Sequence, residues 1–139
     1  MALRRERPPE VIAIDTSAII AIALSEPEAK PFSELLVREG AVVPTTVLVE
    51  ASLVLARKMP TFAEAYLRGF MSRKAVRAVD FSFPMYEEAH RGFQRFGSGK
   101  SGLNFGDCMT YGAAKVLGLP LLFTGLDFSR TDLRPAYVA

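Results

Sequence analysis

A chain of 139 residues is long enough for one domain with a hydrophobic core and too short for two domains of ordinary size. Half of the residues are hydrophobic and 23% are charged, which excludes a disordered or fibrous protein, and the net charge of +2 does not by itself identify a partner. The longest apolar run, residues 18–24, is far shorter than the roughly 18 residues that a membrane-spanning helix needs.

The single cysteine and the N-terminus indicate a cytoplasmic protein. Cys108 has no second cysteine with which to form an internal disulfide. The basic residues within 4–7 are followed by Pro8-Pro9 and not by the apolar stretch of a signal peptide. Basic residues elsewhere lie on polar stretches, which suits an anionic substrate and equally a solvated surface. These residues are Arg57, Lys58, Arg73, Lys74, Arg77, Arg91, Arg95 and Lys100.

Short apolar runs alternate with helix-like segments in the first half of the chain. Residues 11–14 form a β-branched run before Asp15-Thr16-Ser17, which predicts a buried strand that meets a helix N-cap. Pro27 and Gly40 begin and end a further predicted helix, and Thr45 or Thr46 is predicted to cap the next one. In chain order the pattern predicts a strand over 11–14, helices over 18–25 and 27–39, a strand over 41–43, and helices over 45–58 and 60–71.

The second half of the chain repeats this alternation. Pro84 is typical of the first turn of a helix, and Gly118 is typical of the residue that follows one. The predicted elements are a strand over 76–81, a helix over 84–96, a Gly/Ser-rich link over 97–102, a helix over 104–117, a strand over 121–124 and an edge strand near residues 137–138.

Strands that alternate with helices predict an α/β fold with a central, mostly parallel sheet covered by helices on both faces. Connections in such a sheet are right-handed crossovers. Ligands of such sheets bind beyond the carboxyl ends of the strands. Acidic residues that follow predicted strands are therefore candidates for a functional site.

Two acidic residues come directly after predicted strands. Asp15 follows the first strand, and Asp127 follows the fourth in Thr124-Gly125-Leu126-Asp127. Taken alone, Asp15 is explained as a helix cap and Asp127 as a turn residue. In a parallel sheet, however, both would lie at the same edge.

Two further acidic residues belong to predicted helices. Glu50 interrupts an apolar run, and helical spacing places it on the face of Val47 and Leu53. A buried, unpaired carboxylate costs several kcal/mol, so Glu50 needs a cation, a raised pKa or a partner such as a structural salt bridge. Asp107 lies three residues after Asn104, a spacing that also fits a capping box.

The four acids together predict a site for Mg²⁺ or Mn²⁺. Carboxylates gathered at one place repel each other unless a hard divalent cation lies between them. A metal held in this way supports phosphodiester hydrolysis. The one histidine, His90, offers no competing ligand set. Gly99-Lys100-Ser101 is not a P-loop, because Gln94 stands where that motif requires glycine.

The motifs that contain these acids resemble those of PIN-domain proteins of the VapC toxin type, in the same order and over nearly the whole chain. Asn104-Phe105-Gly106-Asp107-Cys108 and the stretch from Gly125 to Asp132 are the most specific parts of the resemblance. The others are Ile14-Asp15-Thr16-Ser17-Ala18-Ile19-Ile20, Val49-Glu50-Ala51 and the residues 121–124 that precede Gly125.

The resemblance implies a PIN-like three-layer α/β/α sandwich formed by a single domain over residues 1–139, with residues 1–10 as a flexible N-terminal extension. It also implies an endoribonuclease that depends on Mg²⁺ or Mn²⁺, a homodimer, and inhibition by a small VapB-like antitoxin. Asp15, Glu50, Asp107 and Asp127 match the acidic residues of the family, as catalytic residues and metal ligands. Asp132 is close enough in sequence to take the place of Asp127 or to support it. Thr16, Ser17 and Asn104 are candidates for supporting the ligands or contacting the substrate.

Two alternatives to a toxin nuclease are a non-catalytic PIN-like module that binds RNA or protein, and a housekeeping RNA-processing nuclease. Two surfaces are also predicted. Arg91 and Arg95 are spaced to share a helix face near Asp107, where they would hold phosphates. Apolar residues around Glu50 and over residues 62–70 exceed what so small a domain easily buries, and are expected to form a dimer or antitoxin surface.

Overall fold

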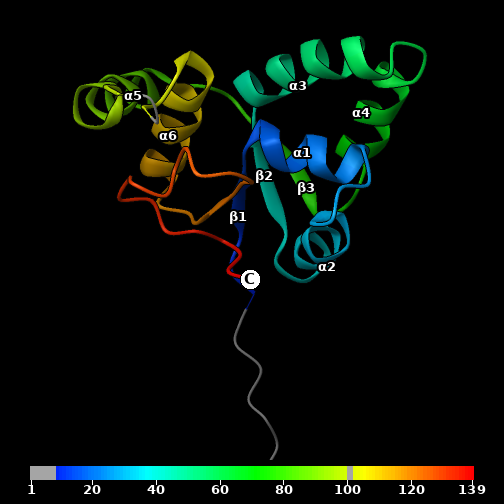
Figure 1. The fold of residues 1–139 in the computed structure, drawn as a ribbon. Helices are drawn as coiled ribbons and strands as arrows, with labels where there is room; N and C mark the ends of the chain where they lie inside the picture. The colour runs from blue at the N-terminus through cyan, green and yellow to red at the C-terminus, as the bar shows by residue number, and fades with distance from the viewer. Residues whose placement is uncertain (1–8, 100–101) are drawn as a thin grey trace, which may run out of the picture.

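The computed structural model describes residues 9–99 and 102–139, and these form alternating strands and helices (Figure 1). Lys100 and Ser101, and most of the predicted N-terminal extension, lie outside the described residues. Among the described residues no helix is long and apolar enough to cross a membrane. The elements are β1 (Ile12–Ile14), α1 (Thr16–Ala23), α2 (Ala29–Glu39), β2 (Ala41–Pro44), α3 (Thr45–Lys58), α4 (Ala63–Met71), β3 (Val76–Val79), α5 (Phe83–Phe96), α6 (Phe105–Leu117) and β4 (Leu121–Leu122).

The strands form one parallel sheet, as the sequence predicted. Their order in the sheet is β3-β2-β1-β4. Successive residues of β1 point to opposite faces, so that Ile12 and Ile14 enter one core while Ala13 enters another. Figure 1 shows α5 and α6 on one side of the sheet and α1 to α4 on the other. The predicted three-layer α/β/α fold is therefore confirmed.

Most helix boundaries follow from the capping residues that the sequence contains. The Asp15 side chain caps α1, and Asn104 caps α6. Gly40 after α2 has φ +77° and Gly118 after α6 has φ +66°, a conformation that side chains disfavour. The predicted threonine cap of α3 is wrong. The helix starts directly after β2 with no side-chain cap, and the Thr45 hydroxyl instead accepts a hydrogen bond from the Phe81 backbone N–H.

The predicted edge strand near residues 137–138 is also wrong. The C-terminal tail pairs with the sheet only at a single parallel bridge between Leu121 and Pro135. Arg134 C=O and Ala136 N–H make the two hydrogen bonds of this bridge. Pro135 has no N–H with which to continue a ladder, and Tyr137 turns its ring edge-on against Phe32 at 5.5 Å.

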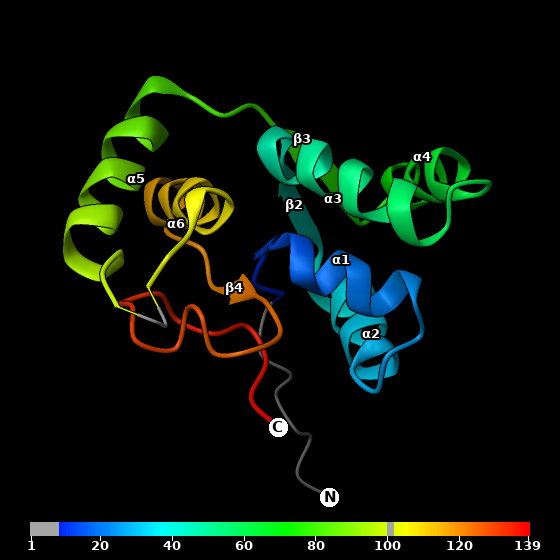
Figure 2. The same ribbon diagram turned by 45° about the horizontal axis from the view of Figure 1, so that its top comes forward.

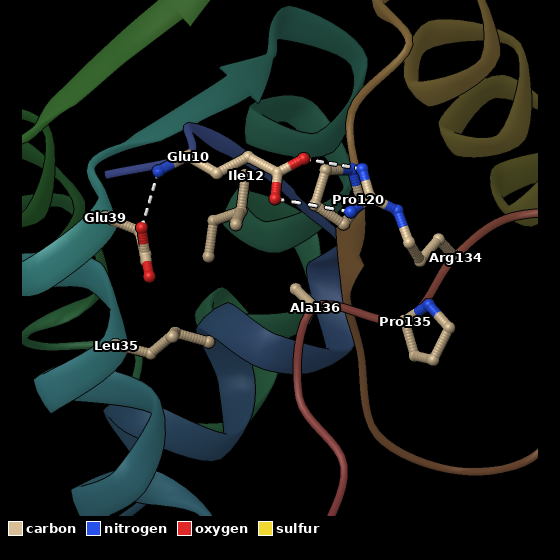
Figure 3. Close-up of a pocket in the computed structure, with 8 residues that line it drawn as sticks. All are labelled: Glu10, Ile12, Leu35, Glu39, Pro120, Arg134, Pro135 and Ala136. Carbon is tan, nitrogen blue, oxygen red and sulfur yellow. Dashed lines mark hydrogen bonds and ion pairs between the residues drawn. The ribbon is translucent and has the colours of Figure 1, made fainter. Parts of the chain in front are cut away.

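The amino end of the sheet is closed by an ionic clamp around Glu10 (Figure 3). The Glu10 backbone N–H donates to Glu39 at 2.6 Å, and the Arg134 guanidinium donates to both oxygens of the Glu10 carboxylate. The clamp borders a small hollow of about 140 Å³ at the end of the sheet where β1 begins. Glu10, assigned from the sequence to a flexible extension, is thus fixed to both α2 and the C-terminal tail.

Candidate active site

A cleft of about 320 Å³ lies at the carboxyl ends of β1 and β4. Figure 2 shows α6 opposite α1 and α3 above this end of the sheet. All four acids singled out from the sequence line it, and Glu26, just beyond α1, adds a fifth carboxylate that the sequence pattern did not indicate. The lining residues are Asp15, Thr16, Ser17, Ile20, Glu26, Glu50, Val54, Asn104, Asp107, Thr124, Asp127 and Phe128.

Asp15 is buried at the junction of β1 and α1, with 4% of its surface exposed. Its Oδ2 accepts hydrogen bonds from the Ser17 backbone N–H at 3.1 Å and from the Ser17 hydroxyl at 2.6 Å. Burial raises the pKa of Asp15, the interactions with Ser17 and Thr110 oppose this, and the charge of Glu50 adds to the rise. Asp15 is therefore both a helix cap and a wall of the cleft.

Asp107 stands in the first turn of α6 and forms a reciprocal capping box with Asn104. Its backbone N–H donates to Asn104 Oδ1 at 2.8 Å, and its Oδ2 accepts from the Asn104 N–H at 3.1 Å. The pKa of Asp107 is raised to about 6, and burial is the main cause. The hydrogen bond from Asn104 lowers the pKa, whereas the charges of Asp127, Asp15 and Glu50 raise it further. Capping alone does not produce this electrostatic coupling between acids from four distant segments.

Glu50 is half-buried on α3, and no ion pair of it occurs within residues 9–99 and 102–139. The structural salt bridge considered from the sequence is therefore not found in that part of the chain. The apolar helix face predicted around Glu50 is only partly buried: Val47 is buried, whereas Leu53 is 60% exposed. The Glu50 carboxylate instead lies against Gly106, where a Cβ atom would stand only 2.1 Å from Oε2.

Asp127 and Asp132 lie on the same loop but in different surroundings. Asp127 is exposed and lines the cleft. Asp132 does not line it, because its carboxylate accepts hydrogen bonds from the Tyr111 hydroxyl at 2.7 Å and from Lys115 Nζ at 2.6 Å. Burial opposes ionisation of Asp132, but these hydrogen bonds keep its pKa below the usual value. Of the two, only Asp127 lines the cleft.

The two arginines predicted to hold phosphates do not line the acidic cleft. Arg91 pairs with Glu88 at 2.6 Å within α5. Arg95 lies over the Phe96 ring and 3.5 Å from the Asp132 carboxylate. These contacts do not test phosphate binding by the two arginines, which stays a prediction; spacing on α5 alone did not reveal which neighbouring acids would engage the guanidinium groups.

The cleft gathers carboxylates but does not form a ready-made metal site. Among the described residues, no three His, Cys, Asp or Glu side chains are already placed to hold one metal. The carboxylates nevertheless share a single cleft, and the Thr16 hydroxyl beside them is buried without a hydrogen-bond partner in the described part of the chain. Oxygen donors of these types are the ones that Mg²⁺ and Mn²⁺ take.

Exposed apolar side chains lie on the three helices α3, α5 and α6, and together they are called the apolar surface. They are those of Val49, Leu53, Phe83, Tyr86, Phe93 and Phe105. On the α5 and α6 side this surface includes a groove of about 500 Å³. The surface predicted over residues 62–70 is only partly correct, because Phe62 is 65% exposed but Phe70 is buried in the core.

Comparison with known proteins agrees with this fold and site. Residues 12–133 match the PIN domain family. Over 125 residues the chain is 34% identical to Ribonuclease VapC30 of Mycobacterium tuberculosis, a match that covers 88% of this chain and 95% of the relative. It is 36% identical over 131 residues to Ribonuclease VapC of Mycolicibacterium smegmatis, covering 88% and 97%. The chain therefore belongs to the PIN-domain family, among the VapC ribonucleases.

Solved structures of low sequence identity share the fold. The M. tuberculosis protein VapC20, described as a Sarcin-Ricin loop cleaving toxin, superposes with a TM-score of 0.71 at 18% identity, covering 89% of this chain and 99% of that one. VapBC2 from Rickettsia felis, bound to a DNA fragment from its promoter, also gives a TM-score of 0.71, at 17% identity with 90% and 96% covered.

Proposed function

We propose that this protein is a Mg²⁺- or Mn²⁺-dependent endoribonuclease and the toxin of a VapBC-type pair. The observation that carries the proposal is the single cleft lined by Asp15, Glu50, Asp107 and Asp127, which come from four separate segments. The VapC relatives support the activity. In this proposal the protein acts on RNA in the cytoplasm. Its whole chain forms one domain.

The four carboxylates are proposed to be the metal ligands and the catalytic residues. The raised pKa of Asp107 supports this: burial is its main cause, and the charges of Asp127, Asp15 and Glu50, which a divalent cation would neutralise, add to it. A bound metal supplies a water of lowered pKa and offsets negative charge on the phosphate.

The residues around the ligands orient them. Ser17 donates to Asp15 and so holds its carboxylate toward the cleft. The capping box fixes Asp107 through Asn104. Burial of Asp15 excludes bulk water from one wall of the site, and this strengthens its interaction with a cation.

A non-catalytic PIN-like module is the second candidate, and the helix caps made by Asp15 and Asp107 favour it. These caps explain two acids without a metal. They do not explain why Glu50 and Asp127 line the same cleft without an ion pair among the described residues. We therefore prefer the nuclease.

The proposed partners are RNA, a VapB-like antitoxin and a second copy of the chain. VapBC complexes among the structural neighbours, from R. felis and Salmonella typhimurium, support an antitoxin and favour a toxin over a housekeeping nuclease. The groove of about 500 Å³ within the apolar surface on α5 and α6 supports a homodimer, because contiguous apolar patches on a protein surface mark sites of protein interaction.

The deciding experiment is incubation of the purified protein with total RNA in the presence of Mg²⁺, Mn²⁺ or EDTA. Cleavage that requires a metal and is lost in Asp107→Asn supports the nuclease. The matched control is Glu34→Gln on the exposed side of α2, which should cleave like the wild type. RNA that stays intact with either metal, while the protein still binds it, supports the non-catalytic module.

A further inference from the structure

The loop over residues 124–132 carries Asp127, and both of its ends are held by hydrogen bonds to the helices that present other acids of the site, α1 at the first end and α6 at the second. At the first end, the Thr124 N–H donates to the Ser17 hydroxyl at 3.0 Å, and that hydroxyl donates to Asp15 at 2.6 Å. In the middle, Phe128 is 2% exposed and packs against Phe123. Asp127 itself is exposed, so its place depends on how the rest of the loop is held.

At the second end, Asp132 joins the loop to α6. Its Oδ1 accepts from the Tyr111 hydroxyl at 2.7 Å, and its Oδ2 accepts from Lys115 at 2.6 Å and from Arg95 at 3.5 Å. Tyr111 and Lys115 lie one and two turns after Asp107 on the same helix. The helix that presents Asp107 therefore also holds the loop that presents Asp127.

The Tyr111 side of this contact is rigid. Tyr111 is 1% exposed, and its ring lies against Gly92, where a Cβ atom would stand 2.4 Å from a ring carbon. The Phe96 ring covers another side, at a centroid distance of 5.8 Å. A side chain packed so closely offers its hydroxyl at a fixed point, so the bond to Asp132 determines where the loop ends.

We propose that Asp132 is a positioning residue for the nuclease: by joining the end of the 124–132 loop to Tyr111 and Lys115, it sets the place of Asp127 relative to Asp107. This inference rests on the proposed function. Asp132 touches neither metal nor substrate and acts through Asp127. A charged, multiply bonded carboxylate suits such a role, because hydrogen bonds between charged groups are shorter and stronger than neutral ones.

The first test needs neither RNA nor metal. Amide hydrogen exchange is compared in the wild type, Asp132→Ala and Tyr111→Phe, the second of which removes only the hydroxyl. The Ser129 and Thr131 amides should exchange about tenfold faster in Tyr111→Phe, as expected for loss of one charge-assisted hydrogen bond, and at least as much faster in Asp132→Ala, which loses the contacts with Tyr111, Lys115 and Arg95. The matched control is Arg134→Gln, which breaks the Glu10 clamp at the opposite end of the sheet and should leave these amides unchanged.

The second test is a double-mutant cycle in RNA cleavage. Asp132→Ala should lower kcat by roughly tenfold with little change in KM, since misplacing a reacting group by an ångström lowers rates by up to about a hundredfold. In the Asp127→Asn background the same change should have no further effect. Arg134→Gln should lower neither parameter.

Two results would overturn the inference: loop amides as well protected in both variants as in the wild type, or an undiminished effect of Asp132→Ala when Asp127 is already replaced. If the wild type cleaves no RNA with either metal, the proposed function fails, and the exchange experiment still decides whether Asp132 holds the loop.

Discussion

The Glu50 carboxylate lies directly against the backbone of Gly106, one residue before Asp107. A Cβ atom on residue 106 would be 2.1 Å from Glu50 Oε2 and 2.8 Å from its carboxyl carbon. The missing side chain thus lets an acid from α3 approach the first turn of α6. The positive end of the helix dipole also favours a carboxylate at this position.

The first prediction concerns Gly106→Ala. The added methyl group should displace the Glu50 carboxylate and lower RNA cleavage by about tenfold or more, because catalytic groups tolerate displacements of only a fraction of an ångström. Glu50 is at the end of a flexible side chain, so the fold should survive. Cleavage and the melting temperature are measured together.

The matched control for this change is Gly69→Ala in α4, where a Cβ atom meets nothing within 4 Å. It should leave cleavage unchanged and raise stability by about 0.5–1 kcal/mol, since alanine is the better helix former. Normal cleavage by Gly106→Ala would show that the position of Glu50 is not important.

The second prediction concerns Asp107→Asn. Removing one charge from the cleft relieves repulsion, so the variant should be at least as stable as the wild type in EDTA. The wild type should gain roughly 1.4 kcal/mol at a tenfold excess of Mn²⁺ over its dissociation constant, and the variant should lose most of that gain.

Melting curves with Mn²⁺ and with EDTA test this, and Glu34→Gln, an exposed carboxylate away from the cleft, serves as the control. The side-chain oxygen of asparagine at position 107 can still accept the hydrogen bond from the Asn104 N–H, so a purely capping role predicts an unchanged metal response. Equal metal-induced shifts in all three proteins would therefore contradict the metal site.

The third prediction is a dependence of stability on pH. The pKa of Asp107 is raised from 3.8 to about 6, so between these values the folded protein binds a proton that the unfolded chain releases. The contribution of Asp107 to the free energy of unfolding is therefore most favourable below about pH 4 and is lost as pH rises through 6. In EDTA, wild-type stability should fall across this window relative to Asp107→Asn.

Urea unfolding of both proteins from pH 4 to 7.5 measures the effect. Since a metal ligand must be ionised, stabilisation by Mn²⁺ should change in the opposite direction and increase through about pH 6. A stability difference between wild type and variant that is constant over the whole range would contradict the raised pKa.

The fourth prediction concerns the apolar surface. Leu53 is 60% exposed on α3 and Phe105 is 81% exposed at the start of α6. Replacing either with lysine should shift a dimer to monomer at micromolar concentration, because a charge is costly at the core of an interface. Sedimentation measures the assembly.

The control is Val37→Lys on α2, where an equally exposed apolar residue lies outside this surface. Its assembly should match that of the wild type. If the wild type sediments as a monomer, or if both surface variants remain dimeric, the homodimer does not form through this surface.

Much of the fold follows from local sequence. Short, continuous apolar runs identified β1 and β2, because the strands of a parallel sheet are buried on both faces. Asp15, Asn104, Gly40 and Gly118 marked helix ends through short-range capping chemistry. The two Asp residues that follow strands could be placed at one edge of the sheet, because parallel strands end together.

Only the tertiary structure decided which charged groups meet. Asp132 is close enough in sequence to take the place of Asp127, but Tyr111 and Lys115 engage Asp132, and Asp127 lines the cleft. The same holds for Arg95, which contacts Asp132, 37 residues away along the chain. Local patterns determine where a helix or strand begins and ends, whereas side-chain partners from distant segments depend on packing that no short stretch of sequence encodes.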